Sequence, residues 1–217
     1  MEHRLMDCKP ERRYRRSIRL PAYDYASPGA YFATICTYKR ECIFGVQELR
    51  DVVEETWRQI AFHLPNARTD ELVIMPNHVH GILWILKTKV GAQHAAPLRP
   101  TRAPAVEPRS LGAIVRSFKS AAAKRINEIR RTPGAPVWQR NYYERVIRSE
   151  DELNRIREYT HLNPLQWEFD RENPHRVASH EYQREWSWLE GNERGAAPIG
   201  RGAACCAPTF NTRENRR

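Results

Sequence analysis

Two histidines separated by one residue form the sharpest candidate site in this sequence. His78, Val79 and His80 lie within the otherwise apolar segment MPNHVHGILWI. Alternate side chains of a strand share a face, so the two imidazoles would lie about 7 Å apart or slightly less and could bind one divalent cation. Histidines that only hydrogen-bond to neighbours at a strand end are the alternative interpretation. Polar rings buried among apolar residues need partners, however, and this favours the cation.

A tyrosine and an asparagine at helical spacing form the second candidate site. Tyr159 and Asn163 are four residues apart, so on a helix they share one face, roughly 6 Å apart along the axis. A tyrosine phenol, whose ordinary pKa is about 10, is a poor nucleophile at neutral pH unless a nearby cation polarises its target. A core tyrosine beside a helix-capping asparagine is the alternative interpretation.

The histidine pair alone leaves the coordination shell of a metal ion incomplete. At least one further oxygen or nitrogen ligand must come from elsewhere in the chain. A hard cation such as Mg²⁺ or Mn²⁺ would also take phosphate oxygens from a substrate.

Basic and aromatic residues are concentrated between residues 109 and 148, where ten Lys or Arg stand against Glu128 and Glu144. Cations that alternate with rings suit a single nucleic-acid strand, whose phosphates need charge and whose bases need stacking surfaces. A solvated basic surface is the alternative. The candidate DNA contacts are Arg116, Lys119, Arg140, Tyr142, Tyr143 and Arg145.

Apolar periodicity and turn residues predict the elements that must position these side chains. Helices are expected at about 48–64, over about 20 residues that start at Leu111 with Ser110 as N-cap, and from Ser149 to Asn163. Pro164 disfavours helical geometry at the residue before it, which ends the third helix. The predicted strands are Tyr31–Thr37, Glu71–Met75, His78–Leu86 and Val137–Ile147.

The order of these elements predicts the fold class. The strands are too few and too short for a doubly wound sheet, and the order is β-α-β-β-α-β-α. We therefore expect an α+β protein: a ferredoxin-like antiparallel sheet with helices on one side, followed by a C-terminal helix that carries the tyrosine.

Composition divides the chain into one domain and three irregular segments. We expect a basic N-terminal arm at 1–19, a domain at 20–189 that contains a proline-rich loop at 87–108, and a disordered Gly/Ala/Arg-rich tail at 190–217.

Charge and cysteine usage restrict the partners and the compartment. The chain of 217 residues has a formal net charge of +10 and a pI near 9.7, which favours polyanions: nucleic acid first and an acidic membrane surface second. No run of 18 apolar residues is present. The five cysteines are odd in number and lack CxxC spacing, so we expect reduced thiols in a cytoplasm.

Four segments together resemble one family. They are RRSIRLPAYDYASPGAYFATICTYKRECIFG, MPNHVHGILWI, WQRNYYERVIRSEDEL and IREYTHLNP. This combination is similar to the REP-associated tyrosine transposases, domesticated bacterial relatives of the single-tyrosine HUH insertion-sequence transposases. The resemblance extends from about Arg12 to Trp167, and the combination is far more specific than any one motif.

The resemblance implies a mechanism and a substrate. In the family's HUH palm, His78 and His80 would hold Mg²⁺ or Mn²⁺, with Val79 as the hydrophobic residue between them. Tyr159 would attack a scissile phosphate of single-stranded DNA, giving a 5′-phosphotyrosine and a free 3′-hydroxyl. Asn163 stands where relatives have a glutamine that completes the metal shell. The implied substrate is a repetitive extragenic palindromic (REP) hairpin with its adjacent single-stranded tetranucleotide, bound by a monomer or homodimer at the nucleoid.

Two other functions remain open. A non-catalytic nucleic-acid-binding module on the same fold would account for the basic charge and the aromatic rings, but not for the His78–His80 pair. A metallohydrolase of small molecules would account for the histidines, but not for the basic stretch.

Overall fold

The structure is a computed structural model and describes residues 23–87 and 109–190. The expectations for the arm at 1–19, for nearly all of the loop at 87–108 and for the tail from 191 onward fall outside these ranges. Within them, the elements follow the order β-α-β-β-α-β and two further helices complete the chain.

A four-stranded sheet forms the centre of the molecule. Its strands run in the order β2-β3-β1-β4, and every neighbouring pair is antiparallel. β3 and β1 therefore occupy the middle, where both faces of a strand are covered. The strands are β1 (Gly29–Cys36), β2 (Ala67–Met75), β3 (His78–Ile85) and β4 (Tyr143–Ile147).

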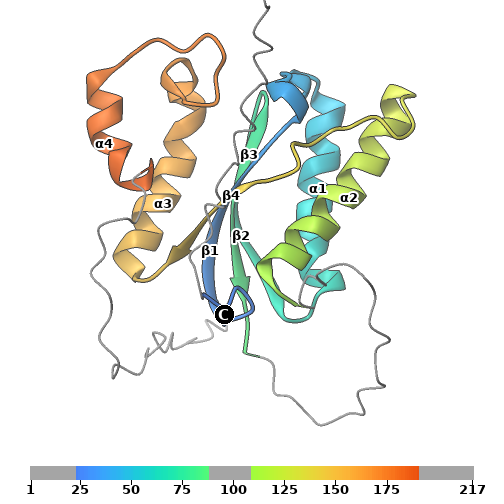
Figure 1. Cartoon of the computed structure of the whole chain (residues 1–217), viewed down its shortest axis with the longest axis horizontal. Coiled ribbons are helices and arrows are strands. Elements are labelled where there is room, and N and C mark those ends of the chain that lie inside the picture. The colour runs from blue at the N-terminus through green and yellow to red at the C-terminus, as the bar shows by residue number, and fades with distance from the viewer. Residues whose placement is uncertain (1–22, 88–108, 191–217) are drawn as a thin grey trace, which may run out of the picture.

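Helices α1 (Gln47–His63) and α2 (Leu111–Arg130) lie side by side on one face of this sheet (Figure 1). Their apolar side chains bury one core, to which Trp57 and Phe118 contribute rings with centroids 5.3 Å apart. A β-carbon on Gly81 would lie 2.4 Å from the Trp57 ring, so this position of β3 requires glycine. The ferredoxin-like arrangement predicted from the sequence is confirmed.

The opposite face of the sheet is covered as well, by α3 (Glu150–Leu162), the 3-10 helix η3 (Asn163–Phe169) and α4 (His180–Glu190) (Figure 1). The sequence predicted helices on one side only, and α4 was not predicted. The reason lies in β3, which is buried along its whole length. Its alternate residues enter two different cores, so each face of the sheet needs its own helical layer.

The strand predicted at Val137–Ile147 is shorter in the structure. Only β4 pairs continuously, while the residues before it cross the end of β1 through a single bridge between Thr37 and Trp138. The Lys119 ammonium donates hydrogen bonds to the carbonyls of Gln139 and Arg140, at 2.5 and 3.0 Å, and fixes this crossing segment to α2. These carbonyls bond to a side chain and not to a neighbouring strand.

The helix caps predicted from the sequence are present. Ser110 Oγ accepts a hydrogen bond from the backbone N–H of Ala113 at the start of α2, and Ser149 Oγ accepts one from Glu152 at the start of α3. The Glu152 carboxylate in turn accepts a hydrogen bond from the backbone N–H of Arg148. In a capping box the donor would be the N–H of the N-cap residue itself, Ser149.

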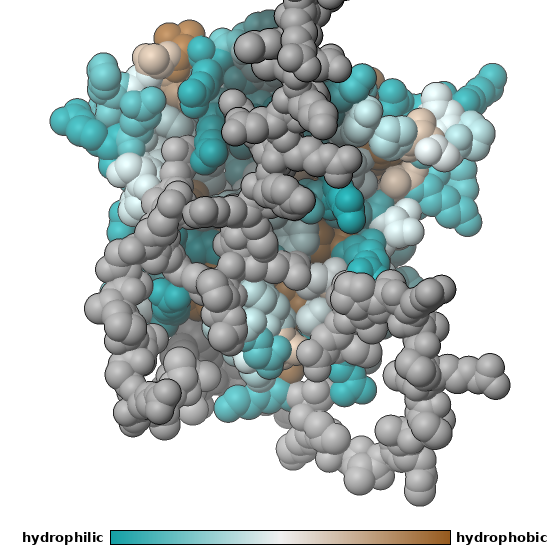
Figure 2. All heavy atoms as spheres, in the orientation of Figure 1, coloured by the Kyte–Doolittle hydropathy of each residue, from teal (hydrophilic) through white to brown (hydrophobic). Residues whose placement is uncertain are grey.

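None of the described helices is long and apolar enough to cross a membrane. The visible outer surfaces of both helical layers carry mainly hydrophilic residues (Figure 2).

Candidate metal centre and its tyrosine

The two histidines of β3 point to the same side of the sheet and converge. Their Nε2 atoms lie 2.9 Å apart, and His78 and His80 are 0% and 3% exposed. The strand therefore places both imidazoles on the one face that its alternation predicts, but the rings converge to a centroid distance of 4.4 Å, closer than the expected spacing of about 7 Å.

Asn77 determines which nitrogen of His78 faces His80. Its side-chain amide donates to the carbonyls of Glu172, at 2.7 Å, and Arg40, at 3.3 Å. This orientation leaves Asn77 Oδ1 as the acceptor for His78 Nδ1 at 2.8 Å, so the ring proton of His78 lies on Nδ1. The Nε2 of neutral His78 consequently directs a lone pair at His80.

His80 has the equivalent partner on the neighbouring strand. Thr34 of β1 is its register partner, and the hydroxyl lies 2.8 Å from His80 Nδ1. Outer partners of this kind orient imidazoles that ligate metals. When both Nδ1 atoms are engaged by their outer partners, the two Nε2 atoms meet in the interior.

Because His78 Nε2 is an acceptor, the 2.9 Å contact between the two Nε2 atoms is a hydrogen bond donated by His80. A divalent cation would take the place of this shared proton, because both nitrogens point at one position and metal ligands bind in their deprotonated form.

Asp170 completes a three-residue group that the sequence did not predict. Ligand atoms of His78, His80 and Asp170 all lie within 4.8 Å of one another, and the carboxylate is 1% exposed. Asp170 Oδ2 lies 3.8 Å from His78 Nε2 and accepts no hydrogen bond within the described residues. A buried anionic oxygen without a donor fits a metal ligand.

The charges of this group follow from its burial. Burial and the adjacent His80 lower the pKa of His78 well below its ordinary value, against the opposing effect of Asp170. Burial alone would raise the pKa of Asp170, but His80, His78 and the backbone N–H of Glu172 outweigh it and hold the pKa at about 2. At neutral pH the group therefore contains a neutral His78 and an anionic Asp170, the forms in which these side chains bind metals.

Tyr159 brings its hydroxyl to the same point from the other layer of the molecule. Its Oη lies 3.4 Å from His80 Nε2, and the side chain is 7% exposed. Phe32 and Trp186 contact the tyrosine ring edge-on, at centroid distances of 6.1 and 5.1 Å. The histidine pair and the tyrosine, 79 residues apart in the sequence, meet within one chain.

Asn163 follows Tyr159 by one turn, at the C-cap of α3. It is 0% exposed, and neither polar atom of its side chain has a hydrogen-bond partner within the described residues. A fully buried amide without partners is costly. It fits a ligand role, although its side chain forms no hydrogen bond with either histidine.

Four of the six predicted DNA contacts take part in contacts within the protein. Tyr143 Oη donates to the carbonyl of Leu189 at 2.7 Å, and Arg145 pairs with Glu152 at 2.7 Å and donates to the carbonyl of Trp188. Both residues thereby tie β4 to helices of the second layer. Lys119 holds the crossing segment described above, Tyr142 is half-buried against the first core, and Arg116 and Arg140 are exposed.

Asp170 could have been noticed only through its chain neighbours. It follows the IREYTHLNP motif within a dozen residues, but an acidic residue in a turn is common and carries no spacing signature. The 3-10 helix η3 starts at Asn163 and ends just before Asp170, and its turn brings Asp170 back onto the sheet.

Fold and site together define a class: α+β proteins with a buried His–His–Asp group on the central strand of a ferredoxin-like sheet and a tyrosine directed at it. No family model matches the chain. An uncharacterized protein of Haemophilus influenzae (strain Rd) is 41% identical over 170 residues, which is 72% of this chain and 92% of that protein. The chain belongs to the same family as this Haemophilus protein.

Two solved structures are similar to this one. A REP-associated tyrosine transposase bound to a REP hairpin has a TM-score of 0.48 and 16% identity, covering 67% of this chain and 72% of its own. A candidate transposase from Deinococcus radiodurans R1 has a TM-score of 0.39 and 22% identity, covering 66% and 95%. Both neighbours are named as transposases.

Proposed function

We propose that this protein is a metal-dependent nickase and strand transferase of single-stranded DNA that works through a 5′-phosphotyrosine. The observation that carries the proposal is the position of the Tyr159 hydroxyl, 3.4 Å from His80 in a buried group with His78 and Asp170. A nucleophile and a candidate cation site at one point are the two parts that phosphodiester transesterification needs.

His78, His80 and Asp170 are the residues that would hold Mg²⁺ or Mn²⁺, with Asn163 as a candidate fourth ligand. A bound divalent cation supplies Lewis-acid neutralisation of the non-bridging oxygens of a phosphate. Asn77 and Thr34 keep the histidine nitrogens directed at that position.

The reaction exchanges one phosphate ester for another. Tyr159 Oη forms a bond to phosphorus while the bond from phosphorus to the 3′-oxygen breaks. The phenolic proton is transferred overall to the departing oxygen, which leaves as a 3′-hydroxyl. Because the phosphotyrosine retains the ester, the strand can be rejoined without a nucleotide cofactor.

The proposed substrate is a REP-like hairpin with its flanking single strand, bound in the cytoplasm at the nucleoid. Its support is the resemblance of the sequence motifs together with the net charge of +10. Because His80 and Tyr159 of one chain already meet, a monomer contains the complete candidate site.

The test is incubation with labelled hairpin DNA from palindromes that flank the protein's own gene, with and without Mg²⁺ or Mn²⁺. We expect a nicked strand and a covalent protein–DNA adduct only with the metal. Metal-independent binding without nicking would support the non-catalytic module instead.

His78→Ala, His80→Ala and Asp170→Asn should each reduce nicking at least 100-fold and leave most of the DNA affinity, because the cation acts chiefly on the transition state. Nicking rate and a DNA-binding isotherm measure the two effects. The exposed His63→Ala serves as the matched control. Full-rate nicking by the wild type in excess chelator would contradict the metal role.

A further inference from the structure

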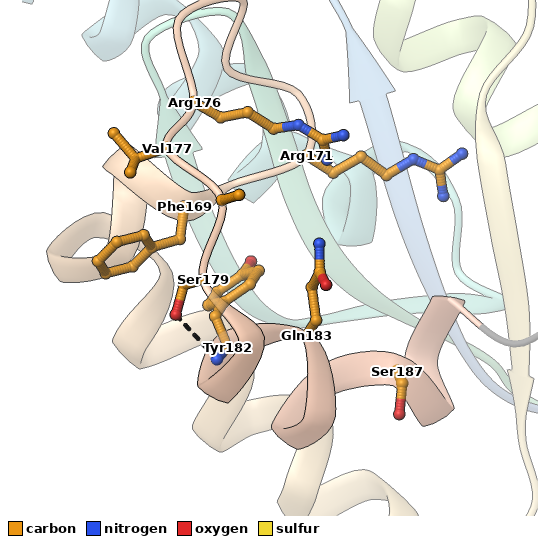
Figure 3. Close-up of a pocket in the computed structure, with 9 residues that line it drawn as sticks. Phe169, Arg171, Arg176, Val177, Ser179, Tyr182, Gln183 and Ser187 are labelled. Carbon is orange, nitrogen blue, oxygen red and sulfur yellow. Dashed lines mark hydrogen bonds between the residues drawn. The ribbon is translucent and has the colours of Figure 1, made fainter.

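A pocket of about 410 Å³ lies between the segment that follows η3 and helix α4 (Figure 3). Phe169 and Arg171 line it, and these residues immediately flank Asp170 in the chain. Neither the predicted metal ligands nor the predicted DNA contacts line this pocket. The proposed reaction assigns no role to this pocket.

The lining combines positive charge with aromatic surface. Arg171 and Arg176 contribute two guanidinium groups, and none of the described residues that line the pocket is acidic. In Figure 3 both arginine side chains extend in the same direction across the upper part of the pocket, and Gln183 of α4 points up toward them. Two cations and an amide that line one pocket suit an anion with several oxygens, such as a phosphate diester.

The two guanidinium groups are available for such an anion. Both arginines are exposed, and neither forms an ion pair with any acidic residue of the described chain. The nearby Arg40 is different, because its guanidinium is held by Glu172 at 2.6 Å.

Aromatic rings form the apolar part of the pocket. Phe169 and Tyr182 lie with centroids 6.1 Å apart and belong to the same buried cluster as Tyr159. Tyr182 is buried, but Phe169 is only partly buried, so a planar base can pack against Phe169 while its phosphate reaches the arginines. The pocket volume lies within the range of small-molecule sites, about 300–1,000 Å³.

We propose that this pocket binds one nucleotide of the DNA strand next to the scissile phosphate, its phosphate at Arg171 and Arg176 and its base against Phe169. This inference rests on the proposed function, because Phe169 and Arg171 adjoin the candidate metal ligand Asp170 in the chain. A nucleotide held at these residues would fix which phosphate of the strand stands at the metal.

The test compares binding of a fluorescein-labelled 12-nucleotide oligothymidine by the full-length protein and four variants. Arg171→Ala with Arg176→Ala removes both charges, and Ser187→Trp fills the pocket while keeping them. Arg184→Ala is the matched control, because Arg184 is an exposed arginine of α4 outside the pocket. Gln183→Ala tests the amide alone.

We expect the double arginine variant and Ser187→Trp each to weaken binding on the order of tenfold, with less than a twofold effect from Arg184→Ala. The double variant should also flatten the dependence of log K on log salt by about 0.7 for each phosphate that the arginines no longer neutralise. Mn²⁺ affinity at the metal group should not change in any of these variants. An abasic nucleotide placed at successive positions should weaken wild-type binding at one position and not weaken Ser187→Trp further there.

Two results would overturn the inference. Equal weakening by the double arginine variant and by Arg184→Ala would show that only general charge matters, and unimpaired binding by Ser187→Trp would show that the pocket stays empty. Failure of the wild type to bind any single strand would instead contradict the proposed function.

Discussion

Asn77 shows how a residue that touches no substrate can control this site. It bonds to His78 Nδ1 and to two backbone carbonyls, those of Arg40 and Glu172, so one amide ties the metal group to two neighbouring loops. Both Lys39 and Arg40 adopt the left-handed conformation, with φ of 52° and 59°. The hydrogen bond from the Asn77 amide to the carbonyl of Arg40 helps to hold this strained turn beside the histidine.

Asn77→Ala should weaken Mn²⁺ binding about 10- to 100-fold, the usual effect of removing an outer partner of a ligating histidine. Isothermal calorimetry measures the affinity. Asn66→Ala is the control, because Asn66 is also buried and donates to a backbone carbonyl, that of Arg109, at 3.2 Å. Equal Mn²⁺ affinity in wild type and Asn77→Ala would show that His78 needs no orienting partner.

Tyr159→Phe should retain the fold and the DNA affinity and abolish both nicking and the covalent adduct, because only the nucleophilic oxygen is removed. Tyr142→Phe and Tyr143→Phe are matched controls and should retain an adduct. Tyr142 packs with the first core, and the Tyr143 hydroxyl donates to the carbonyl of Leu189, whereas the Tyr159 hydroxyl lies 3.4 Å from His80. Mass spectrometry of the trapped peptide locates the nucleotide, and an adduct that survives in Tyr159→Phe would rule out this nucleophile.

At the scale of elements, α3 must be held firmly if its tyrosine is to meet β3. Arg157, two residues before Tyr159, forms an ion pair with Asp70 of β2 at 2.6 Å. The indole N–H of Trp84 donates to the same carboxylate at 2.9 Å, and the Arg157 and Trp84 hydrogen bonds lower the pKa of Asp70 although burial opposes them. This three-residue contact joins α3, β2 and β3.

Asp70→Ala should destabilise the protein by about 1–3 kcal/mol, mainly because the Trp84 N–H is left without its acceptor. Asp70→Asn keeps an acceptor oxygen for Trp84 and should cost about 1 kcal/mol or less, since Arg157 is partly exposed. Urea unfolding measures the free energy of unfolding of both variants. If α3 is positioned through this contact, Asp70→Ala also slows nicking at saturating DNA, while DNA affinity stays within about twofold. An unchanged nicking rate would show that core packing alone positions α3.

At the scale of the whole molecule, the buried site makes stability depend on pH. The folded pKa of His78 is lowered, so the native state keeps this ring neutral while the unfolded chain takes up a proton below about pH 6.5. Stability should therefore fall as pH decreases through 6.5, by at most about 1.4 kcal/mol per pH unit for this one group. The pKa of Asp170, about 2 in the fold against an ordinary 3.8, adds a further decrease in stability below pH 3.8.

Urea unfolding of metal-free protein at pH 8, 6.5, 5 and 3 checks this dependence. Mn²⁺ should raise the midpoint at pH 8 and have no such effect at low pH, because protons compete for the same ligands. Exposed His63→Ala should leave the profile unchanged. Stability that increased from pH 6.5 to pH 5 would contradict a buried neutral His78.

The sequence by itself determined the features that depend on local geometry. The alternation of a strand placed His78 and His80 on one face, the 3.6-residue period predicted α1 and α2, and Ser110 and Ser149 marked the starts of two helices. Each of these follows from residues within one or two turns of one another.

Only the tertiary structure decided which distant residues share the site. Asp170 reaches the histidines because η3 folds back over the sheet, and no local sequence pattern predicts that this segment folds back. Tyr143 and Arg145, which the sequence predicts as DNA contacts, donate to backbone carbonyls of α4, a helix the sequence did not predict. Side-chain partners across 40 or more residues depend on how layers pack, and packing is decided by the whole chain at once.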